Sequence, residues 1–165
     1  MSTEHHDLAI EDLGVRPTGP VPFLIGGFGR RVVGIAARHA DIFQFTGLVH
    51  GVGGAPTPAG FAMADVVVRR DWLVAAAGDR NEAIERSALV QRTAIGPDTS
   101  ALRTELCDRW GMDGEQLDSS PFALVGSVEQ VIDKLEYQRE HLGISHIVVR
   151  DVEAMAPVVA ALAGR

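Results

Sequence analysis

The sequence predicts an α/β protein in which four strand-plus-helix units follow one another on a parallel sheet. Short apolar runs alternate along the chain with segments of helical periodicity. The apolar runs are nearly continuous rather than alternating, which is typical of strands buried on both faces of a parallel sheet. The connections are long enough for the helical crossovers that parallel strands require. With 165 residues, 46% of them hydrophobic, the chain corresponds to one globular domain.

The first unit follows a polar lead-in. We expect residues 1–20 to be an N-terminal tail or loop, because Arg16–Pro20 is rich in turn formers. The folded domain is then predicted to cover residues 21–165. It begins with a buried strand over residues 21–27 and a helix over residues 29–40.

The second and third units are predicted from the same alternation. A strand over residues 41–46 precedes a stretch, 47–60, whose five glycines and two prolines exclude regular structure. A helix over residues 61–77 follows and ends at Gly78. We expect residues 83–87 to be a short connecting segment, residues 89–95 to form the third strand and residues 100–110 a helix.

The fourth unit carries the clearest helix start signal. Ser127 and Gln130 have the spacing of a capping box, in which each side chain accepts a hydrogen bond from the other residue's backbone N–H. The helix is predicted to end at Gly143. A strand over residues 144–149 and a last helix over residues 153–162 complete the alternation.

Charge and hydropathy exclude several classes of protein. The net charge of −7 and the absence of a basic stripe argue against a nucleic-acid partner. No apolar run approaches the ~20 residues that span a bilayer, and the acidic, polar start is unlike a secretory signal, so a cytoplasmic protein without membrane contact is predicted. The single cysteine, Cys107, is assigned no role.

The turn between the first strand and helix is the strongest candidate binding site. Glycines allow backbone N–H groups to approach an anion closely, and a helix N-terminus adds partial positive charge. The candidate phosphate-binding residues are Gly26, Gly27, Phe28, Gly29 and Arg30, with Arg31 as the alternative cation. A turn that needs glycine merely for packing is the competing interpretation.

The other candidates are weaker. His50 follows the second strand and enters the glycine-rich loop, which makes it the one histidine to test for catalysis. Asp41 starts a strand and is expected to be structural, and Arg69 and Arg70 are interpreted as ordinary surface charges. No metal site is predicted, because His5, His6 and Asp7 lack further converging ligands.

Six segments together resemble the bacterial-luciferase-like monooxygenases, particularly the branch of coenzyme F420-dependent oxidoreductases. They are PFLIGGFGR (22–30), AARHAD (36–41), RRDWL (69–73), AGDR (77–80), SPFALVGSVEQV (120–131) and LGISHIVV (142–149). The resemblance implies the second half of a TIM (β/α)8 barrel, with Gly26, Gly27, Phe28, Gly29 and Arg30 near the phosphate of F420 or FMN. A closed barrel needs ~250 residues, so the first four units have no counterpart here.

The resemblance implies a flavin- or F420-dependent oxidoreductase or monooxygenase that lacks the half carrying most catalytic residues. Whether the chain is an enzyme on its own is therefore open. A complementary half-barrel chain or a homodimer is the expected partner, because four parallel strands leave two unpaired edges. The alternative function is a non-catalytic remnant or binding module for a phosphorylated ligand or a partner protein.

Overall fold

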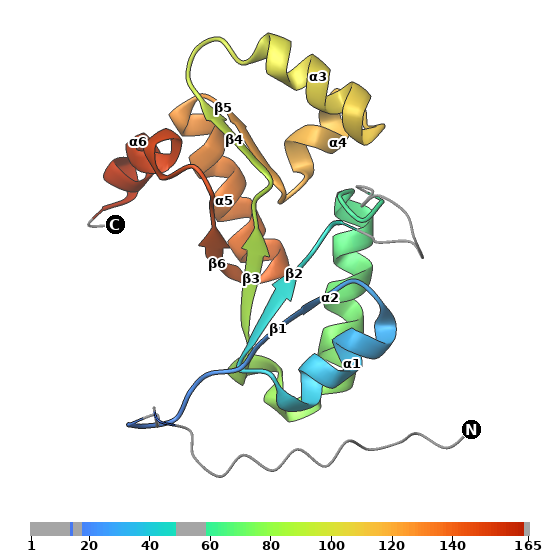
Figure 1. Ribbon diagram of the computed structural model, residues 1–165. Coiled ribbons are helices and arrows are strands. Elements are labelled where there is room, and N and C mark those ends of the chain that lie inside the picture. Colours follow the sequence, from blue (N-terminus) through green and yellow to red (C-terminus); the bar gives the residue numbers. More distant parts are fainter. Residues whose placement is uncertain (1–13, 15–17, 49–58, 164–165) are drawn as a thin grey trace.

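The computed structural model describes residues 14, 18–48 and 59–163. Its main sheet contains four parallel strands in the order β1 (Leu24–Gly27), β2 (Ile42–Phe45), β3 (Glu85–Leu89) and β6 (Ile144–Val148). Helices α1 (Arg30–His39) and α2 (Met63–Ala77) lie side by side next to β1 and β2 (Figure 1). The predicted α/β class, with strands and helices alternating on a parallel sheet, is confirmed.

The two faces of the main sheet differ in what they contact. Phe43 and Phe45 of β2 are fully buried, in one hydrophobic core with Val33 of α1 and Leu73 of α2. Side chains alternate between the faces of a strand, and the register aligns Gly26, Gln44, Ser87 and His146 in a row on the opposite face. On that opposite face, at the β1 edge, the side chain of Leu24 is 47% exposed.

The third strand differs from the prediction. Residues 85–89, which include most of the expected connecting segment, form β3, whereas β4 (Arg92–Ile95) leaves the main sheet and pairs with β5 (Ala123–Gly126) in a second parallel sheet. The partner changes between adjacent residues, because the Val90 N–H donates to Val148 O (2.9 Å) and the Gln91 N–H to Phe122 O (2.8 Å). The prediction of a single strand over residues 89–95 was therefore wrong.

The charged residues at the start of β3 concealed it in the sequence. Arg86 is half-buried, and its guanidinium group donates to Leu142 O (3.0 Å) and to Asn81 Oδ1 (2.7 Å) in the 3₁₀ helix η1 (Gly78–Ala83). These hydrogen bonds satisfy some of the donors of the guanidinium group, whose burial would otherwise be unfavourable. The strand accordingly tolerates a charged residue where the apolar pattern predicted none.

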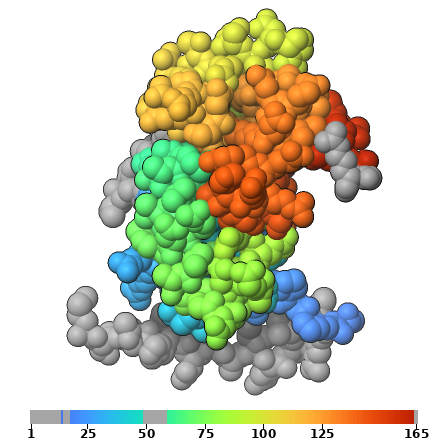
Figure 2. Space-filling model, turned by 180° about the vertical axis from the view of Figure 1, so that it is seen from behind, coloured from blue at the N-terminus to red at the C-terminus, as the bar shows by residue number. Residues whose placement is uncertain are grey.

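The second sheet carries its own helices. Around β4 and β5 lie α3 (Ser100–Trp110), α4 (Gly114–Ser119), α5 (Val128–Leu142) and α6 (Val152–Leu162). Two further cores fill this region, one of them joining β5 to α5 and α6 through Leu124, Val131 and Val158. Seen from behind, this region forms one end of the molecule and α1, α2 and η1 form the other (Figure 2). Neither β5 nor α4 was predicted as a regular element.

The remaining helices agree with the sequence analysis to within one or two residues. α3 has the predicted bounds, and α5 begins with the predicted capping box and ends at Gly143, which adopts a left-handed conformation (φ 70°). Within the described ranges, no helix combines the length and apolar character needed to cross a membrane. Most of the predicted tail, residues 1–20, lies outside the described residues.

Candidate functional site

The glycine-rich turn connects the carboxyl end of β1 to the N-terminus of α1. Gly29 is the N-cap of α1, and its extended backbone (φ −84°, ψ 151°) provides no side chain to accept a hydrogen bond from the first turn. The first turn of α1 contains no acidic residue. The first backbone N–H groups of a helix lack intrahelical partners, so α1 begins with donors and partial positive charge that its own side chains do not satisfy.

The glycines of this turn serve different purposes. A Cβ atom on Gly27 would lie 2.3 Å from Cγ1 of Val32, so this position requires glycine for close packing. A Cβ atom on Gly29 would have no atom within 4 Å, so the helix start is open. Arg30 and Arg31 are both exposed beside it. Packing therefore explains Gly27, but it leaves Gly29 unexplained.

Arg69 lies beneath the turn and is the main residue that the sequence analysis misjudged. Its side chain is 1% exposed rather than on the surface. The guanidinium carbon lies 4.7 Å from the centre of the Phe28 ring, a cation–π contact. Nη2 donates to Gly60 O (2.7 Å), but Nε and Nη1 have no hydrogen-bond partner among the described residues.

Burying the Arg69 guanidinium group costs free energy, and its contacts in the described part of the chain offset only part of that cost. Desolvation lowers its pKa to about 10, while Asp65, one helical turn earlier, acts in the opposite direction. The group therefore remains a cation at neutral pH, and its Nε and Nη1 atoms, which carry three of the five N–H donors, have no partner among the described residues. A signal for this was present in the sequence, because Val66, Arg69 and Leu73 share one face of a helix at i, i+3 and i+7.

The ends of the glycine-rich loop are fixed next to Arg69. The Gly60 N–H donates to Gly47 O (3.0 Å). A Cβ atom on Gly60 would lie 2.2 Å from the Phe28 ring and 2.6 Å from Nη1 of Arg69, so the backbone packs directly on both side chains. The catalytic candidate His50 lies outside the described residues and stays a prediction.

The other sequence candidates have structural contacts. Asp41 Oδ2 accepts a hydrogen bond from the Phe23 N–H (2.8 Å), which ties the start of β2 to the residue before β1. Arg70 is half-buried, bonded to Asp71 and to His141 O. Within residues 18–48 and 59–163, no group of three His, Cys, Asp or Glu side chains is arranged to hold a metal ion.

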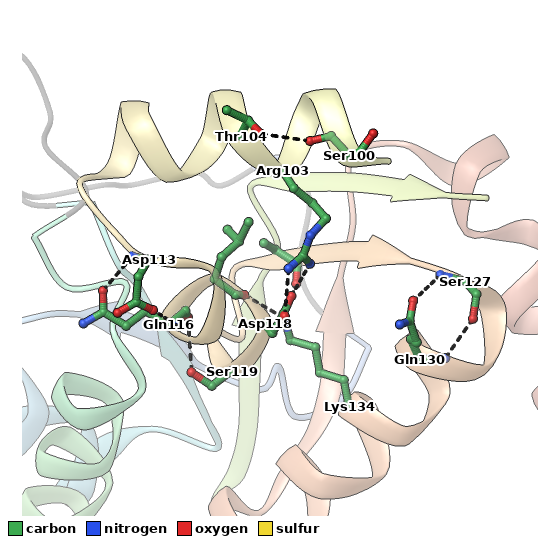
Figure 3. Close-up of polar contacts among 12 residues, drawn as sticks. Ser100, Arg103, Thr104, Asp113, Gln116, Asp118, Ser119, Ser127, Gln130 and Lys134 are labelled. Carbon is green, nitrogen blue, oxygen red and sulfur yellow. Dashed lines mark hydrogen bonds and ion pairs between the residues drawn. The ribbon is translucent and has the colours of Figure 1, made fainter. Parts of the chain in front are cut away.

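The N-terminus of α5 is arranged differently from that of α1. Ser127 and Gln130 form the predicted reciprocal cap, with the Gln130 N–H donating to Ser127 Oγ (3.3 Å) and the Ser127 N–H donating to Gln130 Oε1 (2.9 Å) (Figure 3). Glu129 adds a carboxylate to the first turn. This helix satisfies its own N-terminal donors and offers little to an anion.

The fold recurs in solved structures at low sequence identity. The chain is similar to the coenzyme F420-dependent tetrahydromethanopterin reductase from Methanopyrus kandleri, with a TM-score of 0.54 and 15% identity over 84% of this chain and 49% of that one. It is similar to an F420-dependent secondary alcohol dehydrogenase in complex with an F420–acetone adduct, with a TM-score of 0.56 and 15% identity over 88% of this chain and 50% of that one. For the long-chain alkane monooxygenase LadA the TM-score is 0.50 and the identity 16%, over 83% of this chain and 38% of that one.

These three proteins have the luciferase-like TIM-barrel fold, so the chain has the fold of part of such a barrel. It spans about half the length of the two F420-dependent proteins. No protein-family model matches the sequence. No curated protein matches it either.

Proposed function

We propose that this chain is the C-terminal half-barrel of a luciferase-like flavin- or F420-dependent oxidoreductase or monooxygenase, and that it holds the cofactor phosphate at the start of α1. One observation carries the proposal. The uncapped N-terminus of α1 directly follows Phe28, whose ring packs on the buried Arg69, and two nitrogens of Arg69 have no partner in the described part of the chain. Helix N-termini and arginine are the two groups that proteins use most readily for phosphate.

Each group would contribute differently to holding the phosphate. The backbone N–H groups after Gly29 would donate to phosphate oxygens, while Arg30 would add an exposed positive charge. Arg69 would support the site from below through Phe28, because its charge is screened little by water at 1% exposure. When bound, a flavin or deazaflavin ring supplies hydride transfer or oxygen activation, and the protein supplies orientation and electrostatics.

The proposal includes a complementary half-barrel, either a separate chain or a second copy of this one. β1 and β6 end the strand order, so each has one edge without a strand neighbour among the described residues. Phe23 and Leu24 at the β1 edge are 67% and 47% exposed. Covering exposed edges and apolar side chains is what strand addition achieves.

A binding experiment tests the cofactor site. The purified chain is titrated into F420 and, separately, FMN, alone and mixed with candidate half-barrel chains, while cofactor fluorescence is followed. We expect saturable binding in at least one assembly, with oxidation of the reduced cofactor by that assembly. Absence of binding by every assembly would contradict the cofactor site.

A matched pair of surface variants tests the partner. Leu24→Glu places a charge at the β1 edge, whereas Val68→Glu places one on α2, where Val68 is similarly exposed at 43%. We expect only Leu24→Glu to prevent assembly, as measured by size-exclusion chromatography with light scattering. Equal assembly by both variants would contradict docking at this edge.

The second candidate is a non-catalytic binding module for a phosphorylated ligand or partner protein. In an active barrel, acid–base side chains would be expected at the carboxyl ends of the strands. The residues found there favour this second candidate. In the described part of the chain the residues that follow the strands of the main sheet are Phe28, Thr46, Val90 and Val149. Cofactor binding without turnover in any assembly would favour this alternative.

A further inference from the structure

A cavity of about 880 Å³ lies between α3, α4 and α5. It is built from other elements than the turn at α1, and the proposed cofactor site makes no use of it. Its walls combine apolar groups with the polar side chains of Ser100, Arg103, Thr104, Asp118, Gln130 and Lys134.

Lys134 is the only lysine of the chain and extends from α5 toward the Arg103–Asp118 pair (Figure 3). Its Nζ donates to two backbone carbonyls, Ala123 O at 2.6 Å and Leu117 O at 3.2 Å. No carboxylate lies within ion-pair distance of it among the described residues. The amine is therefore held in place by neutral acceptors rather than by an opposite charge.

The charges around Lys134 come from three helices. Asp118 of α4 is paired with Arg103 of α3, with a second contact at 2.8 Å, and Asp133 is the neighbour of Lys134 on α5. Cys107 of α3 also lines the cavity. Burial lowers the pKa of Lys134 to about 7, while Asp118 raises it and Arg103 lowers it further.

The hydrogen bonding of Lys134 suits a neutral amine. A neutral amine has two N–H donors and one lone pair, and the two carbonyls account for both donors. The third position of the nitrogen then carries the lone pair, in a side chain that lines the cavity. Lysines that are desolvated in this way act as nucleophiles toward carbonyl compounds.

We propose that Lys134 is a carbonyl-reactive amine that condenses with a small hydroxylated aldehyde in this cavity. The nitrogen lone pair adds to the aldehyde carbon, both N–H protons of the amine pass to the carbonyl oxygen, which leaves as water, and a C=N bond replaces the C=O bond. The hydroxyl groups of Thr99, Ser100 and Thr104 and the guanidinium group of Arg103 line the cavity and match a hydroxylated substrate better than an apolar one.

The test uses glyceraldehyde as the probe, with sodium cyanoborohydride to reduce the imine, followed by peptide mapping by mass spectrometry. Because Lys134 is the only lysine, the terminal amine is the only competing primary amine. We expect labelling of Lys134 to exceed that of the terminal amine at pH 7, with a midpoint near pH 7 instead of the ~10.4 of a free lysine. Butanal, an aldehyde of similar size without hydroxyl groups, should label Lys134 at least about 5-fold more slowly.

Two variants separate the cavity from the amine. Thr104→Trp places a large side chain on the exposed face of α3 at the cavity wall and should block labelling of Lys134 while the terminal amine still reacts. Lys134→Arg should remove the adduct entirely. Labelling only at the terminal amine, or labelling of Lys134 with a midpoint near pH 10, would overturn the proposal, and equal rates for butanal would overturn the substrate class. The mapping of the unaltered protein decides the question even if a variant does not fold.

Discussion

The turn from β1 to α1 and the turn from β5 to α5 look alike in sequence and differ in chemistry. Both β1 and β5 end in glycine, Gly27 and Gly126, and both lead into a helix of ten or more residues. At α5 the side chains of Ser127 and Gln130 satisfy the first backbone N–H groups. At α1 no side chain does so. A glycine-rich turn before a helix therefore indicates an anion site only where the helix does not cap itself.

Electrostatics reinforce the difference between the two turns. The backbone N–H of Glu129 and the Ser127 hydroxyl lower the pKa of the Glu129 carboxyl group, so α5 already holds a negative charge at its positive end. The start of α1 has two arginines beside it and Arg69 beneath it. Of these two helix starts, α1 is the one that combines uncapped N–H donors with excess positive charge.

The largest effect is expected when α1 is converted to the arrangement of α5. Gly29→Asp introduces a capping carboxylate at a position with extended backbone and open space, so the fold should accept it. The new side chain would occupy the N–H groups and repel a phosphate. We expect the affinity for F420 or FMN to fall about 100-fold in fluorescence titrations, a free-energy change of ~2.7 kcal/mol.

The matched control is Gly29→Ala, which adds a Cβ atom in the same open space without a charge or an acceptor. It should bind the cofactor within about 3-fold of the unaltered chain, which is less than ~1 kcal/mol. If Gly29→Asp binds the cofactor as tightly as Gly29→Ala, the phosphate does not lie at the start of α1.

The next largest effect is expected when the buried positive charge of Arg69 is removed. Arg69→Met keeps a long side chain beneath Phe28 but removes the charge and the two nitrogens that have no partner among the described residues. We expect cofactor affinity to fall about 10-fold, because a charged donor contributes roughly 1.5–3 kcal/mol. Stability in urea should stay equal or rise, since an imperfectly satisfied buried cation is replaced by an apolar group. A loss of stability without any change in affinity would show that Arg69 only supports the fold.

The sequence was sufficient to predict the alternation of strands and helices, and it was sufficient to predict one of the two turns, the turn before α5. The Ser127 and Gln130 cap could be predicted because its signal is local, three residues apart. The strand β3 was missed because Glu85 and Arg86 interrupt its apolar pattern, and the hydrogen bonds that compensate the burial of Arg86 go to Asn81 and Leu142, outside the strand. β5 was missed for a related reason, since its pairing with β4 depends on a strand that changes sheets after Val90.

Arg69 illustrates the remaining limit of sequence reasoning. Its helical position among Val66 and Leu73 predicts burial, whereas its charge predicts exposure, and the sequence contains no rule that ranks the two. The decision depends on Phe28 and Gly60, which lie 41 and 9 residues away in the chain and meet Arg69 only in the fold. Residues at binding sites often break local rules in this way.

A smaller effect is expected from pH in the α5 region. The pKa of Lys134 is about 7 in the folded chain and ~10.4 in the unfolded chain. Between these values the unfolded chain binds more protons, so the free energy of unfolding should rise with pH from pH 7 to pH 10. Urea denaturation of the unaltered chain and of Lys134→Met at several pH values measures this, and parallel stability curves for the two would contradict it.

The smallest effect tests whether the cap of α5 is purely structural. Ser127→Ala removes the hydroxyl that accepts from the Gln130 N–H and donates to Glu129 (2.8 Å). We expect a loss of ~1 kcal/mol and a decrease in Tm of ~2–4 °C for a domain of this size, with cofactor affinity unchanged. Ser119→Ala is the matched control, because its hydroxyl only donates to Gln116 O within the short helix α4, and its Tm should change less. A Ser127→Ala variant that lost cofactor affinity as strongly as Gly29→Asp would mean that the ligand contacts α5 as well, and the contrast between the two helix starts would no longer hold.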